Sequence, residues 1–317
     1  MSEPWIEVRD LWLERGGRPV LQGVNAALTG RAVGLVGANG AGKSTLIGAL
    51  LGVLRAKSGS IRVLDLEIPG GAMHLRTRAG VMAEQAGIFP GGSGVDAVVF
   101  AGMLSGLPRR ESLRRAHRAL DALDMGEERY RPASGYSTGM KQRTKLAMSL
   151  VHDPEILILD EPTVGLDPIG RTQFLRLIRE LRDQGRHILL STHVLQDAET
   201  VCDEMLLIEG GVVAFSGPVR GLLGAEETLL VAVGAGLDRE FAEGLALLGF
   251  GEASASGERL TFRPRPDGDL LPFWRLASER GAEVRHLSRD MPTLEDAVVA
   301  VMEGGSRGRK DGGSRGR

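Results

Sequence analysis

The sequence predicts an α/β fold in which a mostly parallel sheet is joined by a helical subdomain and a second, smaller domain. Short apolar runs, typical of buried strands, alternate with amphipathic helical patterns over the first two thirds of the chain. A long helical stretch interrupts this alternation, and the pattern changes again after Gly217-Pro218. At about 150 residues per domain, the 317 residues also favour one large and one small domain.

The first domain is expected over residues 1–217. Residues 6–13 and 20–28 alternate apolar and polar side chains, as half-exposed strands do, and Gly16-Gly17 provides a turn between them. These two segments predict antiparallel strands at the N-terminus of the domain. Buried strands of a mixed sheet are predicted at residues 32–36, 156–159, 187–191 and 205–208, further short strands at residues 61–64 and 79–83, and helices at residues 44–54 and 174–181.

A helical subdomain is expected between about residues 86 and 152. Its clearest helix covers residues 110–125, and a second helix is predicted over residues 139–151. The apolar side chains that recur at helical spacing in the first helix, and so predict its buried face, are Leu113, Ala116, Leu120 and Leu123.

The second domain is expected over residues 218–303. Its pattern runs strand, helix, strand, strand, helix, strand, which suggests a small α+β module of the ferredoxin-like type. These six elements are predicted at residues 229–233, 239–248, 250–253, 259–263, 270–280 and 283–287. A short helix at residues 294–302 follows, and the basic tail 304–317 should be disordered because it holds no apolar side chain to bury.

Composition excludes several classes of protein. Apolar residues make up 42% of the chain, which is enough for a packed core and excludes disorder of the whole chain. The formal net charge is −2, and without the five basic residues and one Asp of the tail the body carries −6, so this acidic body offers no broad surface for nucleic acid. The single cysteine, Cys202, excludes an internal disulfide and fits a reducing compartment. Because no signal peptide and no run of about 18 apolar residues is found, we expect a cytoplasmic chain.

A phosphate-binding loop is predicted at residues 37–44, which match the pattern G-x-x-x-x-G-K-S. The loop follows an apolar strand and opens a helix, as this motif requires. Its glycines let backbone N–H groups surround phosphates, and the helix N-terminus adds partial positive charge. Lys43 is expected to reach the β- and γ-phosphates of a nucleotide, and Ser44 to bind Mg²⁺. A plain glycine-rich turn, the alternative, does not explain the lysine and the hydroxyl.

Two carboxylates follow the predicted strand 156–159. Because the strand is fully apolar, Asp160 and Glu161 should emerge at its carboxyl end. Asp160 suits the Mg²⁺ shell of a phosphate-loop enzyme, and Glu161 is placed to orient or deprotonate the attacking water. Without the upstream phosphate loop, a solvated acidic loop would be the better interpretation of these two residues.

Two further segments hold candidate phosphate contacts. His193 follows the strand 187–191 and could contact the γ-phosphate, although a lone histidine is more often structural. Ser137 opens the helix 139–151 as a plausible N-cap, and a helix N-terminus with small residues is also an anion site.

Together these motifs resemble the ATP-binding cassette (ABC) ATPase family over roughly residues 5–217. The six motifs that carry the resemblance occur in family order, at residues 37–44, Gln85, 136–142, Asp160-Glu161, Gly165-Leu166-Asp167 and His193.

The resemblance implies that two cassettes pair head to tail and that each ATP lies between the phosphate loop of one and the signature segment of the other. It implies that Gln85 lies near Mg²⁺ and the contact with a membrane permease. Ser137 and Gly139 would then touch the γ-phosphate of the partner's ATP. In the same way, Asp167 would lie at the dimer seam and His193 would serve as the switch histidine.

The predicted site residues fall into three groups. The expected ATP contacts are Gly37, Asn39, Gly40, Ala41, Gly42, Lys43, Ser44, Thr45, Arg15, Ser137, Gly139 and Asp167. The expected Mg²⁺ contacts are Ser44, Gln85 and Asp160. The expected catalytic residues are Glu161, His193 and Gln85.

Three departures from the family pattern carry information. Thr138 and Met140 replace a glycine and the glutamine of the signature LSGGQ, a variant that resembles exporters whose permeases are separate half-size membrane proteins. Arg15 occupies the place of the aromatic that stacks on adenine. A planar guanidinium can also stack, but Arg15 could instead be an exposed turn residue, with Trp12 or nothing covering the base. The C-terminal module, which ends with residues 292–296, resembles the extra domain of that exporter group.

We therefore expect an ATP-binding and ATP-hydrolysing subunit that powers export of an unidentified substrate. Its partners would be an integral membrane permease and a second ABC ATPase subunit, with a homodimer expected, at the inner face of the cell membrane. Phe89 and Met103 are candidates for the permease contact, or alternatively fill the helical core. A soluble ABC ATPase acting on ribosomes or DNA is the alternative, and a non-hydrolysing scaffold is a third class that Glu161 argues against.

Overall fold

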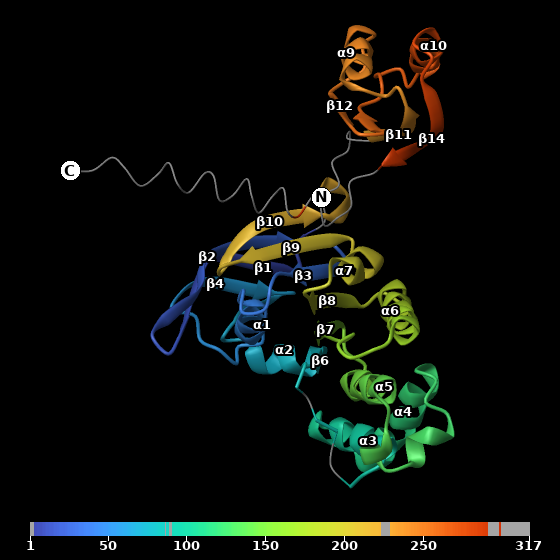
Figure 1. Cartoon of the computed structure of the whole chain (residues 1–317). Coiled ribbons are helices and arrows are strands. Elements are labelled where there is room, and N and C mark those ends of the chain that lie inside the picture. The colour runs from blue at the N-terminus through green and yellow to red at the C-terminus, as the bar shows by residue number, and fades with distance from the viewer. Residues whose placement is uncertain (1–2, 86, 89–90, 223–228, 291–297, 299–317) are drawn as a thin grey trace, which may run out of the picture. The chain divides into compact units, whose positions relative to one another are not determined.

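The computed structural model describes residues 3–85, 87–88, 91–222, 229–290 and 298. Its contacts divide the chain into two compact units, with the boundary between Val219 and Arg220 (Figure 1). The predicted helix 294–302, apart from Val298, and the tail 304–317 lie outside the described residues. No helix in the described ranges is both long enough and apolar enough to cross a bilayer.

A six-stranded sheet forms the centre of the first unit, in the order β10-β9-β3-β8-β7-β6. All neighbours are parallel except β10, which pairs with β9 in antiparallel orientation. The mostly parallel sheet that the sequence predicts is thus confirmed. Its strands are β3 (Ala32–Val36), β6 (Ala79–Met82), β7 (Ile156–Asp160), β8 (His187–Thr192), β9 (Glu204–Glu209) and β10 (Val212–Pro218).

A second sheet of four antiparallel strands carries the N-terminus of the chain, in the order β2-β1-β4-β5. Its strands are β1 (Ile6–Arg15), β2 (Arg18–Leu28), β4 (Ser58–Val63) and β5 (Leu66–Ile68). The apolar faces of this sheet, of α1 and of the central sheet share one hydrophobic core. That core fixes α1, and with it the phosphate loop, against both sheets.

The two faces of the central sheet can be followed along β3. Val33 and Leu35 point into the shared core, whereas Gly34 lies on the other face, where a Cβ would come within 2.9 Å of Ala198 in α7. The helices that the structure describes in the first unit outside the helical subdomain are α1 (Lys43–Leu50), α2 (Ala72–Arg78), α6 (Pro168–Asp183) and α7 (Leu195–Val201), and the short helix α8 (Val219–Leu222) begins at the boundary between the two units. The elements β5, α2, α7, α8 and β10 are not among those predicted from the sequence.

Three helices form the helical subdomain, which lies beyond β6 at the edge of the central sheet (Figure 1). They are α3 (Gly94–Leu104), α4 (Arg109–Ala122) and α5 (Thr138–Leu150), and the short 3₁₀ turns Glu127–Tyr130 and Ala133–Gly135 link α4 to α5. The predicted buried face of α4 is wrong at Leu113, whose side chain is 44% exposed, while Ser112 is buried instead. Ser112 packs against Gly102 of α3, where a Cβ would meet its hydroxyl at 2.9 Å, so this close helix contact requires a small side chain.

The second unit is a four-stranded antiparallel sheet in the order β12-β13-β11-β14, with two helices in the connections. This is the strand order of the ferredoxin-like module that the sequence predicts. Phe241, Phe262 and Phe273 are fully buried in its core. The elements are β11 (Leu229–Ala235), α9 (Arg239–Leu247), β12 (Ala253–Ser256), β13 (Arg259–Phe262), α10 (Leu271–Glu279) and β14 (Glu283–Asp290).

Candidate nucleotide site

The phosphate loop connects β3 to α1 through backbone that only glycine fits. A Cβ on Gly37 would lie 2.3 Å from the carbonyl oxygen of Ile208, so the loop passes too close to β9 for any side chain. Gly42 has a φ of 112° and ends the loop directly before α1. No side chain caps this N-terminus, which leaves the first N–H groups of the helix available to an anion.

A cavity of about 480 Å³ opens over this loop. It brings most of the predicted ATP and Mg²⁺ contacts together at the carboxyl ends of β3 and β7. The lining residues are Arg15, Val20, Ala38, Asn39, Gly40, Gly42, Lys43, Ser44, Thr45, Glu84, Asp160 and Glu161. Arg15, the last residue of β1, lines this cavity and is exposed directly before the Gly16-Gly17 turn.

Ser44 and Asp160 form a polar pair on the wall of the cavity. The Ser44 hydroxyl donates to Asp160 Oδ2 at 2.9 Å. Asp160 Oδ1 is buried and has no hydrogen-bond partner in the described chain. A hydroxyl and a carboxylate oxygen with a free lone pair are ligands that suit Mg²⁺, so these two residues fit that ion.

Glu161 is held in a strained conformation that directs its side chain to the phosphate loop. Its φ is 49°, which is uncommon for a residue with a side chain, and its N–H donates to the Ser191 carbonyl at 2.9 Å. Its Oε1 lies 3.4 Å from Lys43 Nζ, and its Oε2 lies 2.8 Å from His193 Nδ1. The fold thus joins three predicted site residues that are far apart in sequence.

Lys43 is buried and bends back over its own loop. Its Nζ donates to the Gly37 carbonyl at 2.7 Å, in addition to the ion pair with Glu161. A buried ammonium needs such partners because desolvation of a charge is costly. The carbonyl and the carboxylate therefore hold a positive charge at the centre of the phosphate loop.

A second buried carboxylate, Asp197, ties the two loops behind Glu161 and His193 together. Only 1% of Asp197 is exposed, and it accepts hydrogen bonds from Thr163 Oγ1 at 2.6 Å and from Arg171 Nε at 2.7 Å. Thr163 follows Glu161 closely, whereas Asp197 lies in the helix after His193. The sequence analysis does not identify Asp197, since nothing in the local pattern distinguishes it from a helix-surface acid.

The predicted signature residues lie away from the phosphate loop. Ser137 caps α5 by accepting from the Met140 N–H at 3.3 Å, and Asp167 caps α6 by accepting from the Gly170 N–H at 2.7 Å. Ser137 and Gly139 line a separate cavity of about 190 Å³ that shares no residue with the first. Within one chain, the structure therefore does not bring the two halves of the predicted ATP contacts together.

Glu84, rather than its neighbour Gln85, lines the cavity over the phosphate loop. Gln85 is exposed, and the side chain of Lys145 donates to the Glu84 carbonyl at 3.0 Å. Burial lowers the pKa of Lys145. Adjacent Glu and Gln after the same strand cannot be told apart by spacing alone, so only the turn of the chain decides which one faces the cavity.

Comparisons with known proteins agree with this geometry. The ABC transporter family matches residues 21–164. The Nod factor export ATP-binding protein I of Ralstonia nicotianae is 32% identical over 303 residues, which are 95% of this chain and 94% of that protein. The daunorubicin resistance ATP-binding protein DrrA3 of Streptomyces coeruleorubidus is 31% identical over 306 residues, which are 94% of this chain and 96% of that protein.

A solved structure agrees as well. The cbiO1 protein of Clostridium perfringens, part of the ABC transporter complex cbiONQ, is 29% identical to this chain, with a TM-score of 0.63. The match covers 71% of this chain and 92% of that protein. The phosphate loop, the Asp160-Glu161 pair and near full-length relatives lead to one conclusion: the chain belongs to the ABC transporter family and is an ATP-binding, ATP-hydrolysing transporter subunit.

Proposed function

We propose that this chain is the ATPase subunit of an exporter whose membrane permease is a separate polypeptide. Relatives aligned over almost the full chain are named for Nod factor export and for daunorubicin resistance, which supports export rather than uptake. ATP is a cytoplasmic fuel, so the subunit would act at the cytoplasmic face of the membrane, bound to the permease. The exported substrate is recognised by the permease and is not part of the proposal.

The separation of the two cavities is the observation that carries the catalytic part of the proposal. Lys43, Asp160 and Glu161 line one cavity, whereas Ser137 and Gly139 line the other. Two chains in head-to-tail orientation would place the α5 N-terminus of one over the phosphate loop of the other. Such a dimer completes two sites with the residues of two chains, and its simplest form is a homodimer.

Mg²⁺ would be held by Ser44 and Asp160, which already contact each other on the cavity wall. When bound with ATP, the ion neutralises charge that develops on the phosphates. Lys43 would exchange its contact with the Gly37 carbonyl for the phosphates, because both lie within reach of the same Nζ. Glu161 and His193, which are hydrogen-bonded to each other, would then hold and move the proton of the attacking water.

Glu161→Gln tests the catalytic assignment. The substitution keeps the shape and removes the base, so ATP turnover should fall about 10²- to 10⁴-fold while ATP binding persists. ATP-bound dimers should accumulate, as measured by size-exclusion chromatography with Mg²⁺ and ATP. Glu199→Gln, on the exposed surface of α7, is the matched control and should leave turnover unchanged. Near-normal turnover of Glu161→Gln would reject Glu161 as the base.

Exposed apolar side chains on α3 support a docking surface for the permease. Met103 is 46% and Leu104 is 73% exposed at the C-terminal end of this strongly apolar helix, and Phe89 lies outside the described residues. Leu104→Glu should therefore abolish co-purification with the membrane fraction, while the ATPase activity of the soluble chain persists. Met73→Glu, equally exposed on α2, is the control. If the two variants behave alike in the membrane assay, α3 is not the docking surface.

A further inference from the structure

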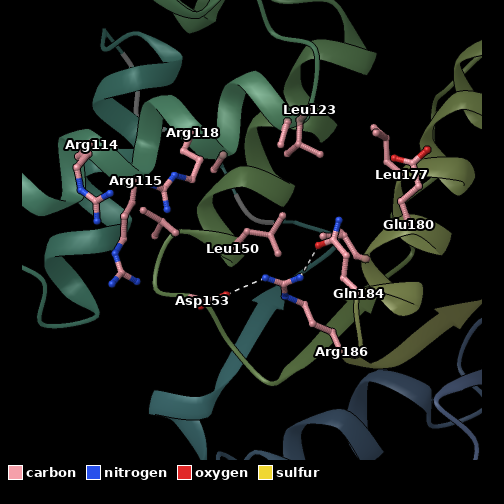
Figure 2. Close-up of a pocket in the computed structure, with 14 residues that line it drawn as sticks. Arg114, Arg115, Arg118, Leu123, Leu150, Asp153, Leu177, Glu180, Gln184 and Arg186 are labelled. Carbon is pink, nitrogen blue, oxygen red and sulfur yellow. Dashed lines mark hydrogen bonds and ion pairs between the residues drawn. The ribbon is translucent and has the colours of Figure 1, made fainter.

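A third cavity, of about 360 Å³, lies between α4 and the C-terminal ends of α5 and α6 (Figure 2). It shares no lining residue with the cavity over the phosphate loop or with the cavity at Ser137. Its volume falls within the range of small-molecule sites, about 300–1,000 Å³. Neither the ATPase reaction nor the proposed dimer uses this cavity.

Leucines from separate elements converge on this space. Leu150 ends α5, while Leu177 and Leu181 lie one turn apart on α6, and all three are only partly buried. Leu123 and Val151 are buried and complete the apolar lining. Figure 2 shows Leu123, Leu150 and Leu177 arranged around the opening between the helices. An apolar ligand would remove the remaining exposed surface of the leucines from water, which favours binding.

Arginines line the same cavity beside the leucines. Arg114, Arg115 and Arg118 follow one another on α4, and Arg186 lies across the cavity before β8 (Figure 2). Arg114 and Arg115 both bind Glu111, and Arg186 binds Asp153 at 2.7 Å. Arg186 is therefore balanced by Asp153, whereas Arg114 and Arg115 share the single negative charge of Glu111.

Arg118 differs from the other arginines of the cavity. It is exposed on α4, and within the described ranges the structure gives it neither an ion pair nor a hydrogen bond. The Arg118 guanidinium thus gives the cavity unused donors, which favour planar anions.

The acidic residues of the lining do not oppose the binding of an anion, because each is already paired with an arginine. Glu180 accepts from Arg176 at 3.0 Å, one turn earlier on α6. Asp153 is occupied by Arg186, and Gln184 accepts from the same guanidinium at 2.8 Å. With both acids paired, positive charge remains at Arg118 and on the Arg114–Arg115 pair, beside the apolar part of the lining.

We propose that this cavity binds an amphipathic organic anion, with its apolar body among the leucines and its carboxylate, sulfonate or phosphate head at Arg118. A bound ligand would bridge α4 of the helical subdomain and α6, the helix that begins at Asp167. The proposal does not depend on the identity of the exported substrate or on the permease.

Isothermal titration of the purified full-length chain with decanoate tests the proposal. The chain is first saturated with Mg²⁺ and ATP in the Glu161→Gln background, so that the phosphate loop is occupied. Decanoate should bind once per chain, and decylammonium, which has the same length and the opposite charge, should bind at least 10-fold more weakly. Equal binding of the two probes would overturn the proposal.

Two variants localise the binding. Arg118→Gln should weaken decanoate binding about 10-fold, the loss expected for one charge-assisted hydrogen bond. Ala122→Glu should abolish binding, because it places a carboxylate in the lining at an exposed helical position that tolerates glutamate. Arg110→Gln removes an exposed charge on the same helix outside the cavity and should change nothing.

Decanoate binding by the two cavity variants decides whether the proposal stands. If Arg118→Gln and Ala122→Glu both bind decanoate like the unsubstituted chain, the anion binds elsewhere and the proposal is rejected. Thermal melting of each variant shows that the fold is retained. Hydrolytic activity is not the readout, so failure here leaves the ATPase assignment untouched.

Discussion

The two helix N-termini that the proposed function assigns to ATP are built in opposite ways. At α1, the loop ends in Gly42 with a φ of 112°, and no side chain caps the helix. At α5, Ser137 has ordinary extended backbone and caps the helix by accepting from the Met140 N–H. The first N-terminus leaves its N–H groups available to phosphate, whereas at the second the N–H of Met140 is satisfied by Ser137 of the same chain.

The two segments also differ in what holds them in place. The phosphate loop depends on backbone shape, since Gly37 passes too close to Ile208 for any side chain. The signature segment depends on side chains: the buried Tyr136 hydroxyl accepts from the Gly94 N–H at 2.9 Å and donates to the Glu128 carbonyl at 2.9 Å. Tyr136 thereby connects the signature segment directly to the N-terminus of α3. Because the signature segment is capped by its own serine and anchored to α3, it can remain ordered without nucleotide. A surface that binds the partner's ATP should be ordered in this way before the two chains meet.

The largest expected effect comes from blocking the α5 N-terminus. Ser137→Arg places a bulky cation on the proposed contact with the partner's ATP, so hydrolysis should be abolished while nucleotide binding to monomers stays within about twofold. Mixing this variant with Lys43→Ala should rebuild at most one complete site per heterodimer, and part of the activity should return. If Ser137→Arg instead abolishes nucleotide binding to the monomer, Ser137 is only a structural cap.

Glycine replacement at the two segments should have unequal effects. Gly42→Ala forces a side chain into a left-handed conformation and into Leu21, at 2.8 Å, which costs about 1–3 kcal/mol. ATP affinity should fall about 10-fold or more, because the loop must shift away from the phosphates. Gly135→Ala, just before the signature segment, meets nothing within 4 Å and should leave affinity unchanged. Equal nucleotide affinities in the two variants would contradict the contrast between the N-termini.

The smallest expected effect concerns the adenine. If the guanidinium of Arg15 stacks on the base, Arg15→Ala should weaken ATP binding about 2- to 30-fold, the worth of one cation–π or stacking contact. Arg15→Tyr should preserve the affinity. Inorganic triphosphate, which lacks the base, should bind Arg15→Ala and the unsubstituted chain equally.

Arg18→Ala is the matched control for Arg15, because Arg18 pairs with Arg15 across the β1–β2 hairpin but does not line the cavity. If Arg15→Ala loses the same affinity for ATP and for inorganic triphosphate, Arg15 acts through its charge. An unchanged ATP affinity would leave Trp12 as the residue to test next.

The chemistry carried by neighbouring residues could be predicted from the sequence. Residues 37–44 form one loop between one strand and one helix, so their type and spacing already define a phosphate site. Asp160 and Glu161 end an apolar strand, which places both carboxylates at the carboxyl edge of a parallel sheet. The ferredoxin-like order of the second unit could be predicted for a similar reason, since its six elements follow one another with short connections.

Prediction from the sequence fails where packing decides which side chain faces the core or the cavity. On α4, periodicity favours Leu113 for the core, yet the close approach of Gly102 selects Ser112. After β6, spacing cannot distinguish Glu84 from Gln85, and the turn of the chain places Glu84 in the cavity.

The residues that can bind phosphate, hold a metal ion or accept a proton could be predicted from the amino-acid sequence, because those properties belong to the side chains and their immediate neighbours. Which of these residues meet depends on the fold: it brings Glu161 into contact with Lys43 and His193, and it links Thr163 to Asp197. It also decided that the third cavity lies between α4 and α6. The physical reason is that distances between segments far apart in sequence are set by the close packing of helices on the central sheet, which no local pattern encodes.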